Sequence, residues 1–281
     1  MQANDLNLNS ALPIGLFDSG IGGLTVLRAM LEAMPAENYL YLGDNARLPY
    51  GTKGPDTITR YCLQAASLLV RHKVKLIVIA CNTASAVALD ALAEAYPDIP
   101  IFGVIEPGAQ AACANTKSGH IAVIATQSTV RGGAYPNAIR RINPGVKIET
   151  KACPLFVPLA EEGLVCGEIA EMVAKHYLAE IFERSPGSAP DCLVLGCTHY
   201  PILKDVIAKV AGPGVALVDS AHTTAQAVQK LFTEGRCPKN HSSTQGQVRY
   251  LTTDDVQPFV RLGKLFMGAN LSTEDVEKVD L

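Results

Sequence analysis

Two cysteines in this sequence, Cys81 and Cys197, stand in the same local setting. Each follows a short apolar run that predicts a buried strand, and each is followed by two polar residues. These polar pairs are Asn82 with Thr83 and Thr198 with His199. The carboxyl ends of strands in an open α/β sheet border the crevice where ligands bind, so both thiols are expected at such a crevice. A positioned thiol can take or give a proton, and two thiols facing one substrate predict a two-base enzyme.

A packing role is the alternative for either cysteine taken alone, because most free cysteines are small buried apolar side chains. The polar residues that follow Cys81 and Cys197 favour the chemical role. Cys62, Cys113 and Cys192 have no comparable neighbours, and we assign them to packing.

One histidine and two glutamates offer further chemistry. His199 lies two residues beyond Cys197. An imidazole there can raise the thiolate fraction of the cysteine or relay its proton, whereas a satisfied buried histidine is the alternative. Glu161 and Glu162 lie in the segment 158–163, where solvated charges at a helix end are the default interpretation.

Two turns are candidate walls of the crevice. The segment 18–23 reads Asp-Ser-Gly-Ile-Gly-Gly, follows the first predicted strand and opens a helix. Its backbone N–H groups can bind an anion, although the G-x-G-x-x-G dinucleotide pattern is absent. Capping of that helix by Asp18 and Ser19 is the simpler interpretation of the turn alone.

The second turn, Leu-Pro-Tyr-Gly at 48–51, follows the second predicted strand. The hydroxyl of Tyr50 and the N–H of Gly51 are candidate donors to a carboxylate. A turn also needs no function beyond reversing the chain, and that interpretation stays open for this segment alone.

Apolar runs rich in β-branched residues predict the strands that position these residues. Stretches of helical period, such as 23–34 and 57–70, separate most of the runs. Strands alternating with helices predict an α/β fold with parallel sheets built from βαβ units. The predicted strands are 14–17, 39–42, 76–80, 101–105, 121–125, 146–150, 193–196, 215–218 and 248–251.

A weak internal repeat predicts two similar halves. The run 14–19 can be laid on 121–126, and the two cysteine strands match at nearly the same offset. We therefore predict a first domain formed by 1–104 together with 219–281, and a second domain formed by 105–218.

The composition excludes several classes of protein. With 281 residues, 48% of them hydrophobic and 18% charged, the chain can form two compact domains or one large one. A net charge of −3 gives no basic stripe, so no nucleic-acid partner is expected. The longest apolar stretch is interrupted by Asn82, Thr83 and Asp90, which leaves it too short for a membrane span.

The segment 1–9 contains Asp5 and no Lys or Arg, so it does not resemble a secretory leader, and we expect a cytoplasmic protein. Eight scattered cysteines in a chain of this size favour reduced thiols. The C-x-x-C spacing typical of zinc sites is absent, so no metal is expected.

Taken together, five motifs resemble the glutamate racemase family of the aspartate/glutamate racemase superfamily. They are Asp-Ser-Gly-Ile-Gly-Gly at 18–23, Pro-Tyr-Gly at 49–51, Ala-Cys-Asn-Thr-Ala at 80–84, Gly-Val-Ile-Glu-Pro-Gly at 103–108 and Gly-Cys-Thr-His-Tyr-Pro at 196–201. Each motif is weak alone, but the ordered set is specific and extends from residue 13 to about residue 268.

The resemblance implies a cofactor-independent enzyme that converts L-glutamate to D-glutamate for peptidoglycan. It implies two similar Rossmann-like α/β domains with the active site in the cleft between them, and a C-terminal segment that rejoins the first domain.

The resemblance also assigns residues. Cys81 and Cys197 become the acid/base thiols, acting on the D-isomer and the L-isomer respectively. Asp18 and His199 tune or relay the protons, and the segment 158–163 supplies a catalytic glutamate, assigned to Glu161 with Glu162 left open. The implied substrate-binding residues are Asp18, Ser19, Pro49, Tyr50, Gly51, Asn82, Thr83, Thr198 and His199.

The implied ligand is a small molecule, L- or D-glutamate. About a dozen residues precede the first predicted strand, and in some family members a longer leader accompanies activation by UDP-N-acetylmuramoyl-L-alanine. Activation by this peptidoglycan precursor and a homodimeric state are both left open. Three other functions remain as alternatives: an aspartate racemase, a binding protein on the same scaffold, and a redox pair formed by the two thiols.

Overall fold

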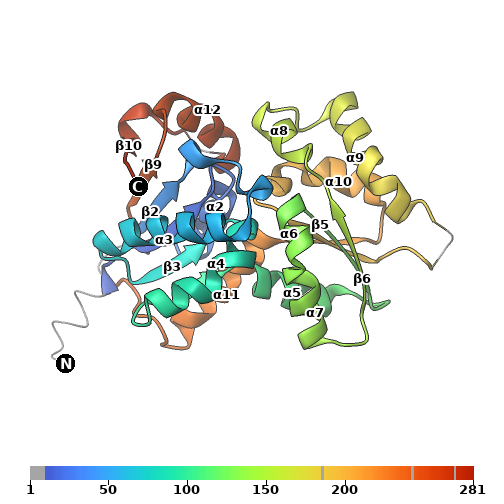
Figure 1. The fold of residues 1–281 in the computed structure, drawn as a ribbon, viewed down its shortest axis with the longest axis horizontal. Coiled ribbons are helices and arrows are strands. Elements are labelled where there is room, and N and C mark those ends of the chain that lie inside the picture. The colour runs from blue at the N-terminus through green and yellow to red at the C-terminus, as the bar shows by residue number, and fades with distance from the viewer. Residues whose placement is uncertain (1–9, 185–186, 242–243, 269) are drawn as a thin grey trace.

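The protein consists of two α/β units that lie side by side (Figure 1). This computed structural model describes residues 10–184, 187–241, 244–268 and 270–281. Residues 1–9, most of the segment before the first predicted strand, lie outside the described residues. The C-terminal end lies on the side of the first unit in this view.

The first unit contains a six-stranded sheet in the order β10-β9-β2-β1-β3-β4, in which every neighbouring pair is parallel. Its strands are β1 (Ile14–Asp18), β2 (Tyr39–Gly43), β3 (Leu76–Ile79), β4 (Ile101–Gly103), β9 (Val248–Thr252) and β10 (Val276–Lys278). Its helices include α2 (Leu24–Ala33), α3 (Pro55–Arg71), α4 (Asn82–Ala95) and α12 (Val256–Met267), with the short 3-10 helices η1 (Asn45–Arg47), η2 (Tyr50–Thr52) and η4 (Thr273–Asp275).

The second unit contains a four-stranded parallel sheet in the order β6-β5-β7-β8. Its strands are β5 (His120–Ala125), β6 (Lys147–Ala152), β7 (Cys192–Gly196) and β8 (Ala216–Asp219). The surrounding helices are α5 (Ile105–Asn115), α6 (Gln127–Gly132), α7 (Ala134–Ile142), α8 (Phe156–Glu161), α9 (Gly167–Phe182), η3 (Tyr200–Leu203) and α10 (Lys204–Ala211). Helix α11 (Ser220–Thr233) packs against both α2 and α5 and joins the two units.

The central strands are buried along their whole length, as parallel strands covered by helices on both faces must be. Helix α3 shows how a covering helix is encoded. Ile58, Cys62, Ala65 and Leu69 recur at helical spacing and form its buried face. Pro55 occupies the first turn, where its missing N–H has no helical partner to lose.

The two sheets repeat one topology. The order β2-β1-β3-β4 in the first corresponds to β6-β5-β7-β8 in the second. In each sheet, the second strand lies on one side of the first strand and the third strand lies on the other. The point at which the strand order reverses, the topological switch point, therefore lies between the first and third strands. The predicted parallel α/β fold and the internal repeat are confirmed. Among the strands of the described residues, only the short β10 has no counterpart in the prediction.

We propose the domain boundaries that the sequence predicts, 1–104 with 219–281 and 105–218. Strands β9 and β10 pair in the first sheet, and β5 to β8 form the second, which supports this division. Within the described residues, no helix combines the length and apolar character that a membrane crossing requires.

Candidate active site

A small cavity of about 30 Å³ lies where the two switch points meet. Cys81 follows β3 and Cys197 follows β7, so each sheet contributes one thiol from its third strand. Asp18 and Ser19 stand at the end of β1, and Thr126 follows β5, the matching first strand. The lining residues are Ser19, Pro49, Tyr50, Gly51, Cys81, Asn82, Thr83, Thr126, Val157, Cys197, Thr198 and His199.

Cys81 is the N-cap of α4, and its Sγ accepts a hydrogen bond from the Ala84 N–H at 3.5 Å. The same thiol lies 3.5 Å from Ser19 Oγ, to which it can donate. Burial and the carboxylate of Asp18 raise the pKa of Cys81 to about 12, although the hydrogen bonds with Ser19 and Ala84 lower it in part. Cys81 is therefore a protonated thiol at neutral pH, able to give a proton.

Cys197 has a charged relay beside it. Its Sγ lies 3.9 Å from His199 Nδ1, and His199 Nε2 lies 3.0 Å from Glu161 Oε1. Burial lowers the pKa of His199, but its hydrogen bonds with Cys197 and Glu161 outweigh burial and raise the pKa to about 10. His199 is therefore an imidazolium at neutral pH. Glu162 is exposed, so geometry selects Glu161 as the partner of this histidine.

Asp18 lies behind the cavity wall and is fully buried. Its Oδ2 accepts from the Gly20 N–H at 3.0 Å, and its Oδ1 accepts from Thr198 Oγ1 at 3.5 Å. Burial raises the pKa of Asp18, and the charge of His199 opposes that rise. The capping interpretation is wrong, because α2 begins after Gly23 with no side-chain cap.

The glycines of the first turn are required by close approach. A Cβ on Gly22 would overlap Thr198 Oγ1 and His199 Nδ1, which belong to the other cysteine motif. The Thr25 hydroxyl donates to the Thr198 carbonyl at 3.0 Å and joins the same two segments. The sequence Gly-Ile-Gly-Gly thus lets the first turn pack directly against the segment after β7.

The Tyr50 hydroxyl does not face the cavity as a free donor, contrary to one of the sequence-based expectations. It donates to Asp44 Oδ2, which also accepts from Arg47 Nε at 2.7 Å, while Asp44 Oδ1 accepts from Thr253 Oγ1 at 3.0 Å. This buried carboxylate fixes the ring, and the backbone N–H of Gly51 remains as the candidate carboxylate donor of this turn.

Hydroxyl and amide groups join the two units around the cavity. Thr83 Oγ1 lies 3.0 Å from Thr126 Oγ1 and 3.1 Å from Thr129 Oγ1.

Two lining residues, Thr126 and Val157, were not predicted from the sequence. The internal repeat held the signal for Thr126, because it lays this residue on Ser19; Val157 lies in α8 and has no such counterpart.

The predicted site residues therefore come together. Ten of the twelve lining residues were predicted. The other two predicted residues do not line the cavity but contact lining residues: Asp18 contacts Thr198, and Glu161 contacts His199. All eight cysteines are free thiols. Within the described ranges, no group of three or more His, Cys, Asp and Glu side chains could hold a metal ion.

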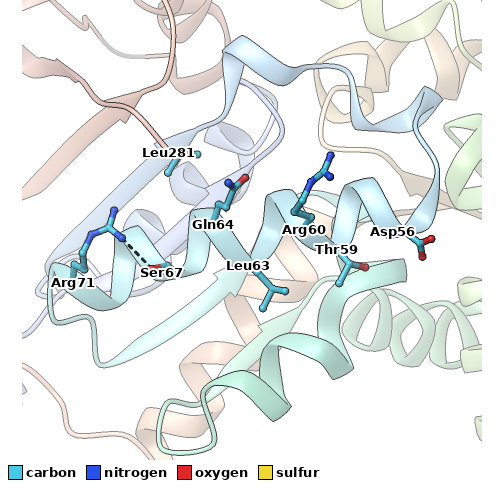
Figure 2. Close-up of a pocket in the computed structure, with 8 residues that line it drawn as sticks. All are labelled: Asp56, Thr59, Arg60, Leu63, Gln64, Ser67, Arg71 and Leu281. Atoms are coloured by element: carbon cyan, nitrogen blue, oxygen red, sulfur yellow. Dashed lines mark hydrogen bonds between the residues drawn. The ribbon is translucent and has the colours of Figure 1, made fainter.

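A larger groove lies on the outer side of α3 (Figure 2). It measures about 570 Å³ and carries no thiol. Figure 2 shows Arg71 donating to Ser67 along the helix, with Leu281 at the far side of the groove. Its residues are Asp56, Thr59, Arg60, Leu63, Gln64, Ser67, Arg71 and Leu281, which offer no acid/base pair comparable with the two cysteines.

The fold and the paired thiols at the strand ends agree with the family that the sequence of this chain matches. The chain belongs to the Asp/Glu/Hydantoin racemase family, whose model matches residues 14–228. The glutamate racemase of Geobacter metallireducens is 51% identical over 268 residues, which cover 95% of this chain and 96% of that protein.

Solved structures agree with this assignment. The glutamate racemase of Francisella tularensis, in complex with D-glutamate, has a TM-score of 0.87 and 37% identity, covering 96% of this chain and 98% of that one. The Escherichia coli glutamate racemase, in complex with L-glutamate and the activator UDP-MurNAc-ala, has a TM-score of 0.77 and 28% identity, covering 96% and 98%. The resemblance to glutamate racemases inferred from the motifs is confirmed.

Proposed function

We propose that this protein is a glutamate racemase that interconverts L- and D-glutamate without a cofactor and supplies D-glutamate for peptidoglycan. The observation that carries the proposal is the pair Cys81 and Cys197, delivered to one cavity by corresponding strands of two sheets. Full-length similarity to glutamate racemases supports glutamate as the substrate.

In the direction from L- to D-glutamate, Cys197 as a thiolate takes the α-proton. The Cα–H bond breaks, an S–H bond forms, and the electron pair remains on the substrate as a carbanion. The Cys81 thiol then donates its proton to the opposite face of Cα, which leaves Cys81 as the thiolate. The reverse direction exchanges the two roles, so no oxidant or other reactant is consumed.

The surrounding charges fit this division of labour. The imidazolium of His199 beside Cys197 is an opposite charge for a thiolate there, and the raised pKa of Cys81 keeps a proton ready for donation. Glu161 stabilises the imidazolium, and Asp18 acts on the Cys81 side through its charge.

We propose that the substrate carboxylates accept hydrogen bonds from the predicted binding residues: the backbone N–H of Gly51 in the turn at 49–51, and polar groups of Ser19, Asn82, Thr83 and Thr198. A volume of about 30 Å³ is close to that of a single water molecule, far less than glutamate needs. We propose that the two units separate around the cavity when the substrate enters.

The decisive experiment is chiral chromatography of L-glutamate and L-aspartate incubated separately with the purified protein, without pyridoxal phosphate and with a chelator present. D-glutamate forming with L-glutamate alone is the expected result. Preferential conversion of aspartate would replace the substrate assignment, and activity that depended on added metal would refute the proposed mechanism. A binding protein would convert neither amino acid. A redox pair would form a Cys81–Cys197 disulfide on mild oxidation without isomerising either.

The same purified protein can be used to test activation and oligomeric state. We propose that UDP-N-acetylmuramoyl-L-alanine is an activator candidate, because the Escherichia coli relative is described with that activator. Rates with and without the precursor decide this point. Sedimentation tests the homodimer, and cell fractionation tests the proposed cytoplasmic location.

A further inference from the structure

Tyr135 of α7 is buried in a slot of the second unit, on the side that faces Asn82 of the first. A Cβ on Gly108 would lie 3.1 Å from its ring, and a Cβ on Gly196 would lie 3.0 Å from the ring on another side. The exposed fraction of Tyr135 is 1%. Small residues on α5 and at the end of β7 thus leave room for a tyrosine and hold its ring in place.

The hydroxyl of Tyr135 reaches across to the first unit. It donates to Asn82 Oδ1 at 2.7 Å, and Asn82 Nδ2 donates to Ser220 Oγ at 3.2 Å. Asn82 begins α4 directly after Cys81 and lines the cavity, whereas Ser220 begins α11. One buried amide is therefore held by hydroxyls from two other helices.

These contacts define how the Asn82 amide is oriented. A separation of 2.7 Å is typical of an O–H···O bond and 3.2 Å suits a weaker N–H···O bond. Burial raises the pKa of Tyr135 far above its ordinary value, so its hydroxyl keeps a proton to donate. The amide oxygen is thus occupied by Tyr135, and the second N–H of Nδ2 is the donor that Asn82 can offer to a ligand.

We propose that Tyr135 is a positioning residue that holds the Asn82 amide with an N–H directed at a substrate carboxylate. This inference rests on the proposed racemase function. Without the phenol hydroxyl, the amide can rotate and present its oxygen, which repels a carboxylate. The loss affects the bound substrate and the transition state alike, so it raises KM and leaves kcat nearly unchanged.

The test is Tyr135→Phe, which keeps the ring in its slot and removes one oxygen. Loss of one neutral hydrogen bond predicts a rise in KM for glutamate of about threefold to tenfold, with kcat within about twofold of wild type. Tyr39→Phe is the matched control, because its buried hydroxyl donates only to the carbonyls of Met30 and Met34, away from the cavity. An unchanged KM in Tyr135→Phe would overturn the inference.

A second variant and a cycle separate positioning from general packing. Ser220→Ala leaves Tyr135 in place, removes the other hydrogen bond of the same amide, and is expected to raise KM about twofold to threefold. Binding of racemic glutamate is measured by NMR titration. In an Asn82→Ala background, adding Tyr135→Phe should cause no further loss of affinity. Independent, multiplicative effects would contradict a role through Asn82. A wild-type protein inactive on glutamate would instead refute the proposed function.

Discussion

Replacing Glu161 by Gln tests the charged relay most directly. The His199 pKa of about 10 lies above the ordinary 6.5, and at about 1.4 kcal/mol per pH unit this favours the imidazolium by roughly 5 kcal/mol. Two neighbours, Cys197 and Glu161, together supply this stabilisation of the imidazolium. Glu161 keeps 30% of its side-chain surface exposed, so solvent reduces its share, and we assign it about 2 kcal/mol.

The sign of the effect follows from the raised pKa. The imidazolium is present below the folded-state pKa and is lost as pH rises through about 10. Removing the carboxylate lowers the His199 pKa by roughly 1 to 2 pH units. The alkaline fall in kcat for L-glutamate is therefore expected to move from about pH 10 to about pH 8 or 9 in Glu161→Gln.

Chiral chromatography or circular dichroism from pH 6 to pH 11 measures this profile. Glu162→Gln is the matched control, because it removes the same charge from the exposed adjacent residue, and its profile should follow the wild type. Stability gives a second measurement. The loss in Glu161→Gln should be about 2 kcal/mol near pH 6 and should vanish above about pH 10, where the wild-type imidazolium is also gone. Identical alkaline limbs in Glu161→Gln and wild type would refute the relay.

Three further outcomes follow from the site and the core. Cys81→Ala and Cys197→Ala should each abolish racemisation with the fold intact, whereas Cys192→Ala, a buried thiol of β7, should retain activity at a stability cost of about 1 kcal/mol; full activity in either of the first two variants would refute the pairing. In deuterated water, early D-glutamate should carry deuterium at Cα by mass spectrometry while unreacted L-glutamate stays mostly protium; substantial retention of the original proton in the product would point to a single base. Lys75→Met should destabilise the protein by about 3–5 kcal/mol in urea unfolding with kcat unchanged, because it leaves the buried Glu37 carboxylate without its cation. A loss well below this range would contradict the assigned dependence of Glu37 on that cation.

The features that sequence predicts here are local or periodic. Cys81 and Cys197 are identifiable because a buried strand and its polar end occupy consecutive positions. The parallel fold follows from the alternation of such strands with helices. The three-residue β10 has too short a pattern to be recognised, and its pairing with β9 depends on tertiary contacts.

The missed features depend on partners distant in the chain. Nothing next to Tyr135 indicates that its hydroxyl reaches Asn82, because only the tertiary structure brings these two distant residues together. The Tyr50 hydroxyl was expected to meet a ligand, but Asp44 accepts it once η1 and η2 have folded. Glu161 could be chosen over Glu162 only when the turn of α8 showed which side chain reaches His199.

The relay beside Cys197 also connects the site with bulk water. Cys197 and His199 are almost fully buried, yet the carboxylate of Glu161 is partly exposed, so a row of three neighbouring side chains leads from this thiol to solvent. Cys81 lies instead beside Ser19 and the completely buried Asp18. The Asp18 carboxylate has no such exposed surface, so the two carboxylates near the thiols differ in their contact with bulk water. The two halves of the duplicated fold thus place one solvent-exposed carboxylate on the Cys197 side of the site and one shielded carboxylate on the Cys81 side.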